Sequence, residues 1–360
     1  MSTLFLNGQS YSFENIKQKG TMLLSEPEHT HQSSFQLIRD WLTHKQSFPF
    51  TTSGSTGIPK SIELSRTQLE ASAQATIDAL SLTANDHVLV CLNTSFIGGA
   101  MLIIRALMAG ASITLQEPSG NPLQYLSTKH PYTFVSFAPM QLFPVLQNTY
   151  AEKAKLSRFN TVLIGGGGID ASLEKELITL NTKTYHTYGM TETVSHIALK
   201  ELGKQQFFEA LPGVQLRTDH RSCLAICCAA TDNEWVQTND VVELNDTHSF
   251  HILGRADDVI NSGGIKIWPA TVEQALREIP GFVFTNICVF GIPDAKLGER
   301  LIAVIETQKP DEHLLSSLSQ QLESRLSKYE IPRQYFTLPT FSYTPTGKIN
   351  KAETLKMIAL

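Results

Sequence analysis

Apolar strand-like segments alternate with helix-like segments along the first half of this 360-residue chain, and this alternation restricts the possible folds more than any other feature. A chain with this rhythm can bury its strands between layers of helices, which favours a parallel sheet and an α/β fold. The strand-like segments are residues 86–92, 112–116, 132–137 and 161–164, and helix-like segments occupy residues 29–43, 67–80 and 99–108.

A polar loop, Thr51 to Lys60, precedes most of these segments and combines hydroxyl side chains with two glycines and a lysine. Gly54 and Gly57 allow positive φ and close approach to a ligand, and the hydroxyl and amide groups are suited to phosphate oxygens. Lys60 adds a mobile positive charge. The spacing is not that of a Walker A loop. An ordinary polar connection is the alternative, because loops rich in Ser, Thr and Gly are common.

Two later segments also indicate a binding site. Four glycines, Gly165 to Gly168, follow the apolar residues 161–164, and their entropic cost indicates close backbone approach, although a tight turn would need the same residues.

Residues 185–193 read Tyr-His-Thr-Tyr-Gly-Met-Thr-Glu-Thr. An aromatic ring can stack on a base, a threonine hydroxyl can bind phosphate, and a glutamate can bind Mg²⁺. A helix cap is the alternative for the Thr-Glu pair.

The order of these motifs resembles that of the adenylate-forming superfamily, which contains acyl- and aryl-CoA ligases, luciferases and the adenylation domains of peptide synthetases. The resemblance runs from about residue 50 to the end of the chain. It implies a reaction of a small-molecule carboxylic acid with ATP through an acyl-adenylate, with Mg²⁺ as metal and CoA as co-substrate. The matching segments are residues 52–60, 165–167, 185–193, 238–240, 252–267 and 345–351.

The resemblance also implies a role for each matching residue. Catalysis is assigned to Lys60, Thr191, Glu192 and Lys348, with Glu192 as the Mg²⁺ ligand and Lys348 bridging the carboxylate and the α-phosphate. The implied nucleotide-binding residues are Thr52, Ser53, Gly54, Ser55, Thr56, Gly57, Gly165, Gly166, Gly167, Tyr188, Gly189, Met190, Asp240 and Arg255.

Asp240 lies in Thr-Asn-Asp, where the superfamily usually has Thr-Gly-Asp. Asparagine tolerates left-handed backbone conformations, so the exchange of glycine for asparagine is mild.

Asp257 is the implied hinge between two domains. Gly263 and Gly264 are implied to approach the adenylate when CoA binds. Lys266 binds a phosphate or the substrate carboxylate in this interpretation, and the alternative is a solvated lysine.

The expected fold is α/β, with a large domain of layered α/β sheets, a small antiparallel barrel-like unit over residues 206–250, and a small mobile α+β domain at the C-terminus. The expected bounds are 1–254 for the large domain, 255–258 for the hinge and 259–360 for the small domain. Typical superfamily members carry a long additional N-terminal subdomain, whereas about fifty residues precede the first motif here. We therefore expect one wall of the large domain to be reduced.

Composition excludes several other classes. A net charge of −5 gives no reason to expect a nucleic-acid or anionic-membrane surface. The first seven residues lack a signal-peptide pattern, and residues 88–115 are interrupted too often for a membrane span. Five cysteines without a CxxC pair favour buried thiols in a reducing compartment. We therefore expect a cytoplasmic protein.

The acid is indicated by fewer residues. Residues 91–104 contain no carboxylate to pair with an α-amine, which disfavours an amino acid. The compact length and residues 94–99 and 191–199 resemble those of short o-succinylbenzoate–CoA ligases of menaquinone biosynthesis. Phe96, Gly98, Ser195 and His196 would suit an aromatic keto-acid with two carboxylates, although His196 could equally be a core histidine.

Two other functions remain open from the sequence. One is an acyl-AMP or CoA ligase for another aryl or fatty acid, or for a carrier-protein thiol. The other is a nucleotide-binding module without turnover, which the retention of Glu192 and Lys348 disfavours.

Overall fold

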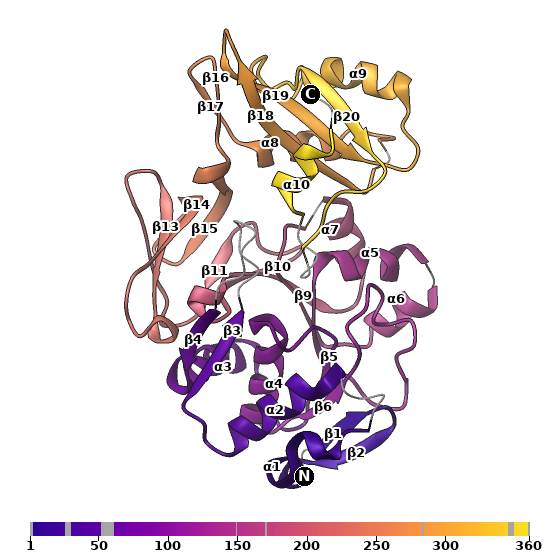
Figure 1. The fold of residues 1–360 in the computed structure, drawn as a ribbon, viewed down its shortest axis with the longest axis vertical. Coiled ribbons are helices and arrows are strands. Elements are labelled where there is room, and N and C mark those ends of the chain that lie inside the picture. Colours follow the sequence, from indigo (N-terminus) through magenta and orange to yellow (C-terminus); the bar gives the residue numbers. More distant parts are fainter. Residues whose placement is uncertain are drawn as a thin grey trace. The chain divides into compact units, whose positions relative to one another are not determined.

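The computed structural model describes residues 3–25, 30–51, 61–148, 150–169, 171–282, 284–344 and 349–358. The chain forms two compact units (Figure 1). None of the helices in the described ranges is long and apolar enough to cross a membrane. Unit 1 contains residues 1–216, 226–236 and 245–249, and unit 2 contains residues 217–225, 237–244 and 250–360.

A sheet with a parallel centre organises unit 1. The pairs β1–β6, β5–β6, β5–β7, β7–β8 and β8–β9 are parallel, and β1–β2, β9–β10 and β10–β11 are antiparallel. The predicted α/β class with a parallel sheet is thus confirmed. In spatial order the strands are β2 (Gln9–Ser12), β1 (Thr3–Leu6), β6 (Ser112–Leu115), β5 (His87–Val90), β7 (Phe134–Phe137), β8 (Thr161–Ile164), β9 (Lys183–Gly189), β10 (His196–Glu201) and β11 (Phe208–Ala210).

Helices bury the faces of this sheet (Figure 1). Helices α5, α6 and α7 pack on β5, β7 and β8 around a core that includes Phe137, Leu142 and Val162. Helix α4 packs on β5 and β6 and contacts α2 and α3, and its only charged residue is Arg105, as expected for a helix surrounded by protein. The helices are α1 (Phe13–Lys19), α2 (Gln32–Leu42), α3 (Arg66–Leu80), α4 (Ile97–Ala109), α5 (Pro139–Asn148), α6 (Tyr150–Leu156) and α7 (Ala171–Leu177).

A separate hairpin in unit 1 flanks the first polar loop. Strands β3 (Ser47–Thr51) and β4 (Ser61–Ser65) are antiparallel, and their register pairs Thr51 with Ser61. Ser65 then caps α3, because its side chain accepts a hydrogen bond from the Gln68 amide. Thr51 and Ser61, which border positions 52–60 in the sequence, are therefore adjacent.

Unit 2 contains parts of four neighbouring strands and a second sheet. The first group, in spatial order, is β12 (Gln215–Thr218), β13 (Cys223–Cys227), β14 (Val236–Leu244) and β15 (Ser249–Arg255), with β14 and β15 antiparallel. In the second sheet β16–β17, β16–β19 and β18–β19 are antiparallel and β19–β20 is parallel. Its strands are β16 (Ile260–Ser262), β17 (Ile265–Ile267), β18 (Asn286–Asp294), β19 (Gly298–Glu306) and β20 (Gln334–Leu338).

Two apolar clusters stabilise this second sheet. One joins α8 (Pro269–Arg277) and α9 (Glu312–Leu322) to β18 and β19, and includes Leu276, Val289 and Leu318. The other includes Phe290, Ile302 and Phe341 and packs against α10 (Lys351–Lys356). Strands β18 and β19 alternate their side chains between the two clusters, which is the α+β arrangement expected of the C-terminal region. The boundary at residues 255–258 stays a prediction.

Candidate functional site

The glycine turn after β8 packs against the neighbouring strand β9. A β-carbon at Gly165 would overlap the hydroxyl of Thr187, so the close approach expected of this turn is made by a side chain of β9. Gly166 has a φ of 84°, and the Gly167 carbonyl oxygen lies 3.1 Å from Nε2 of His186. Burial lowers the pKa of His186 to about 4, so the ring is neutral at pH 7.

The chain turns sharply between β9 and β10, where the predicted nucleotide motif lies. The 3-10 helix η3 (Thr191–Thr193) follows Gly189 and Met190. A β-carbon at Gly189 would overlap the carbonyl oxygen of Ser195 and lie 2.5 Å from Cα of His196. Glycine is required at 189 because the backbone of the returning strand approaches so closely.

Replacement of Gly189 by alanine is expected to lower the melting temperature by several degrees. The added carbon must push β10 away from β9, and such overpacking destabilises proteins by about 1–3 kcal/mol. Thermal unfolding by circular dichroism measures the effect without any substrate. Gly168→Ala is the control, because a β-carbon there meets nothing within 4 Å. Equal melting temperatures for the two variants would contradict the expectation.

The other residues of this motif lie at or near the surface of unit 1. Glu192 is exposed, and Tyr188 and Thr191 are half-buried. The Tyr188 ring lies 6.0 Å from that of Phe208. No group of three or more His, Cys, Asp or Glu that could hold a metal occurs within the described ranges. One exposed carboxylate nevertheless fits Mg²⁺, which proteins bind through one or two carboxylates together with substrate phosphates.

Arg105 is buried beside this motif, although no sequence motif includes it. Its side chain donates from an Nη atom to Oγ of Ser195 at 3.0 Å, while its Nε has no hydrogen-bond partner within the described structure. Burial lowers the pKa of Arg105 to about 9, and the guanidinium stays protonated at neutral pH. A single arginine within an otherwise apolar helix was the signal available in the sequence.

His196 lies next to this pair and points into unit 1. Its Nε2 lies 2.9 Å from the hydroxyl of Thr76, and that hydroxyl lies 3.2 Å from the Ser72 carbonyl oxygen. Burial, and then the charge of Arg105, hold the pKa of His196 well below its usual value. These contacts favour the core-histidine alternative, and a contact between His196 and substrate stays a prediction.

In unit 2 the structure groups three of the residues assigned to nucleotide binding and the hinge. The register of β14 and β15 places Asp240 opposite Arg255, and the guanidinium donates to Asp240 Oδ1 at 3.0 Å. It also donates to both carboxylate oxygens of Asp257, at 2.9 and 2.8 Å. Burial raises the pKa of Asp257, but its hydrogen bonds and the Arg255 charge outweigh burial and lower it.

Gly263 and Gly264 form the turn between β16 and β17. The register pairs Ser262 with Ile265, and the two glycines have φ values of 60° and 83°. Positive φ at both central residues is typical of a type I′ hairpin, for which Gly-Gly is a preferred sequence. Lys266 is exposed on β17. The approach of this turn to an adenylate stays a prediction.

The remaining predicted residues divide into two sets. Phe96 precedes α4 and is half-buried, and Gly98 is exposed in the first turn of that helix. Their contact with a substrate stays a prediction. The other set lies outside the described residues and comprises Thr52, Ser53, Gly54, Ser55, Thr56, Gly57, Lys60 and Lys348.

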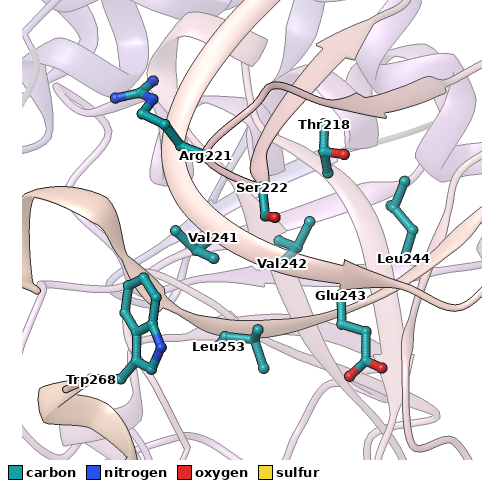
Figure 2. A pocket seen from close by; sticks show the side chains of 9 residues that line it. All are labelled: Thr218, Arg221, Ser222, Val241, Val242, Glu243, Leu244, Leu253 and Trp268. Atoms are coloured by element: carbon teal, nitrogen blue, oxygen red, sulfur yellow. The ribbon is translucent and has the colours of Figure 1, made fainter. Parts of the chain in front are cut away.

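Two cavities lie elsewhere in the described structure. A cavity of about 460 Å³ lies in unit 2. Figure 2 shows the side chains that line it, with Trp268, Val241 and Leu253 near one another and with Arg221 and Glu243 at different ends. A polar cavity of about 310 Å³ in unit 1 lies at the carboxyl ends of β5 and β6 and is lined by His31, Ser34, Thr94 and Gln116, among others. Of the predicted site residues, none lines either cavity.

Known families match both parts of the chain. Residues 44–226 match the AMP-binding enzyme model, and residues 271–348 match the model of the AMP-binding enzyme C-terminal domain. The chain therefore belongs to the AMP-binding enzyme family.

Curated relatives share a narrower name. The 2-succinylbenzoate–CoA ligase of Escherichia coli K12 is 26% identical over 303 residues, which cover 80% of this chain and 64% of the relative. The probable 2-succinylbenzoate–CoA ligase of Mycobacterium tuberculosis H37Rv is 28% identical over 330 residues, which cover 86% of this chain and 84% of the relative. The chain thus spans only about two thirds of the length of some of these relatives.

Solved structures show the same fold. An acyl-CoA synthetase (AMP-forming)/AMP-acid ligase II-like protein from Dyadobacter fermentans is 37% identical, with a TM-score of 0.64, and the match covers 97% of this chain and 99% of that one. The o-succinylbenzoate coenzyme A synthetase of Bacillus subtilis, solved with ATP and magnesium, is 23% identical, with a TM-score of 0.73. The match covers 85% of this chain and 69% of that one. The match to the Dyadobacter fermentans protein therefore covers nearly all of both chains.

Proposed function

We propose that this chain is an AMP-forming carboxylate–CoA ligase whose acid is 2-succinylbenzoate. In the first step a carboxylate oxygen bonds to the α-phosphorus of ATP, and the bond to pyrophosphate breaks. In the second step the CoA sulfur bonds to the acyl carbon, and AMP leaves with the electrons of the broken carbon–oxygen bond. Family membership supports the nucleotide chemistry, and the names of the curated relatives support the acid.

The observation that carries the choice of acid is the buried guanidinium of Arg105. A cation that burial strips of water is stabilised by an acidic partner, and within the described structure its contact is the neutral Ser195 hydroxyl. An acid with a second carboxylate would supply that missing charge. Ser195, which Arg105 contacts, follows Glu192 by three residues, so one molecule could reach both the adenylation residues and the guanidinium.

The remaining assignments follow the same proposal. Thr191 would hold the α-phosphate, and bound Mg²⁺, with Glu192 as its protein ligand, would neutralise phosphate charge while two anions are brought together. Tyr188 and the glycine turn 165–167 would pack on adenine, and Asp240 with Arg255 would bind ribose or phosphate. Lys60 and Lys348 would contribute positive charge at the reacting phosphate.

Asp257 would be the pivot about which the C-terminal domain rotates between the two steps. We place the reaction in the cytoplasm, because all five cysteines are free and buried, as expected of a protein in a reducing compartment.

The proposal is tested by measuring pyrophosphate release from ATP. Each assay contains Mg²⁺, CoA and one acid from a panel. We expect 2-succinylbenzoate to give the highest kcat/KM, and benzoate, which lacks the succinyl carboxylate, to give a kcat/KM at least about 10²-fold lower, because a lost pairing to a buried charge costs about 2–5 kcal/mol. A fatty or other aryl acid that outperforms 2-succinylbenzoate would replace the substrate assignment. No acid-dependent exchange of pyrophosphate into ATP with any acid would favour a binding module instead.

A further inference from the structure

Val194 adopts a backbone conformation that β-branched residues rarely occupy. Its φ is 66° and its ψ is −53°, and the Ser195 amide donates to the Thr193 carbonyl oxygen at 2.8 Å. These values define a γ-turn of the strained kind, with Val194 at its centre. Several other described residues besides glycine have positive φ, but Val194 alone among them is β-branched.

Neighbouring contacts hold Val194 in this conformation. The Val194 amide donates to the Thr191 carbonyl oxygen at 2.9 Å. The Thr193 hydroxyl accepts from the Met190 amide at 3.1 Å and lies 2.9 Å from the Ser195 carbonyl oxygen. The Val194 side chain is fully buried. Strained residues persist where surrounding contacts determine their conformation in this way, and they concentrate at functional sites.

The turn decides which way the next residue points. It reverses the chain directly after η3, so that Ser195 Oγ accepts from Arg105 while its carbonyl oxygen meets Gly189. An extended residue at position 194 would carry Ser195 away from both contacts, because an extended residue advances the chain by about 3.3 Å instead of reversing it.

We propose that Val194 is a positioning residue that fixes the spacing between the two ends of the reaction site. One end is the pair Thr191 and Glu192, at the nucleotide. The other is Ser195 with Arg105, at the acid. This inference rests on the proposed function for the identity of the two ends, but the strain itself is a property of the protein without ligand.

Two variants separate backbone strain from packing. Val194→Ala keeps the β-carbon, and therefore the steric conflict at positive φ, while losing the two methyl groups. Val194→Gly loses the same methyl groups and also the β-carbon, so that positive φ is no longer strained, while the backbone gains access to conformations other than this turn. We expect Val194→Gly to melt a few degrees above Val194→Ala, the reverse of the usual order for alanine and glycine.

Catalysis should follow the opposite order. With 2-succinylbenzoate, Val194→Gly is expected to have a kcat/KM about tenfold below that of Val194→Ala, mainly through a higher KM for the acid, because Ser195 and Arg105 are no longer held in register. A merely structural role predicts that the more stable variant is also the more active. The inference is overturned if Val194→Ala melts at or above Val194→Gly, or if Val194→Gly turns over at least as efficiently.

The two proposals can fail separately. Wild-type protein that releases no pyrophosphate with any acid contradicts the proposed function, whereas the order of the melting temperatures tests the strained turn without substrate. If the wild-type protein is active but Val194→Ala melts at or above Val194→Gly, the role of Val194 is removed and the ligase assignment stands.

Discussion

Lys348→Ala is expected to slow acyl-adenylate formation by about 10²-fold or more, since the loss of one group that stabilises charge in a transition state typically has this effect. Thioester formation from supplied acyl-adenylate and CoA should be retained, because the proposed role of Lys348 is confined to the first step. The two half-reactions are measured separately, as pyrophosphate release in single turnover and as thioester formation from synthetic acyl-adenylate.

The described residues on either side of this lysine indicate that the substitution will leave the fold intact. Tyr343 and Ile349 form an antiparallel bridge. The Tyr343 hydroxyl donates to the carboxylate of Glu306 at 2.5 Å, and the same carboxylate accepts from the Phe341 amide at 2.9 Å. Because Glu306 is buried, these contacts fix Phe341 and Tyr343.

Lys356→Ala is the matched control for this experiment. Lys356 lies on α10 and pairs with Glu353 at the surface, and such pairs contribute little to stability. Its removal should change neither half-reaction. Equal losses of both half-reactions in Lys348→Ala would contradict the assigned role.

Arg105→Met is expected to raise the KM for 2-succinylbenzoate by about 10²-fold or more, because removing one partner of a buried charge pair costs about 2–5 kcal/mol. The kcat/KM for benzoate, which has no second carboxylate, should change little. Initial rates of pyrophosphate release with the two acids measure the difference.

The melting temperature of Arg105→Met is a second measurement, and it should not fall although the KM rises. Without ligand, the Arg105 guanidinium is a buried cation whose Nε has no hydrogen-bond partner among the described residues, so an apolar side chain of similar length should leave the melting temperature unchanged or raise it. Arg105→Lys keeps the charge but not the planar fork, and its KM should fall between those of wild type and Arg105→Met. A similar loss with both acids, together with a lower melting temperature, would assign Arg105 to the core alone.

The sequence predicted those parts of the fold whose hydrophobic pattern is simple. The strand at 161–164 has the expected bounds, and α3 and α4 begin within two residues of the expected positions. Strand β9 was not expected as a strand, because four consecutive half-buried residues at its centre show no alternation. The alternating pattern of a strand requires one buried face, and β9 has none over most of its length.

The site was predicted unevenly for a similar reason. The resemblance assigned Asp240 and Arg255 to nucleotide binding, and the structure pairs these two side chains, but their contact with a nucleotide stays a prediction. The resemblance could not find Arg105 or Val194. The position of Arg105 depends on which turn of α4 faces the start of β10, and the strain at Val194 depends on contacts from Met190 to Ser195. The first depends on tertiary packing and the second on local hydrogen bonds, and motif spacing shows neither.

The pairing of Thr51 with Ser61 has an energetic consequence for any ligand of the loop between them. Bringing together the ends of a free chain of nine residues costs on the order of 2 kcal/mol in closure entropy. In this protein the hairpin meets that requirement during folding, before a ligand arrives. A phosphate that binds there would keep more of its intrinsic affinity than it would on an open segment of the same composition.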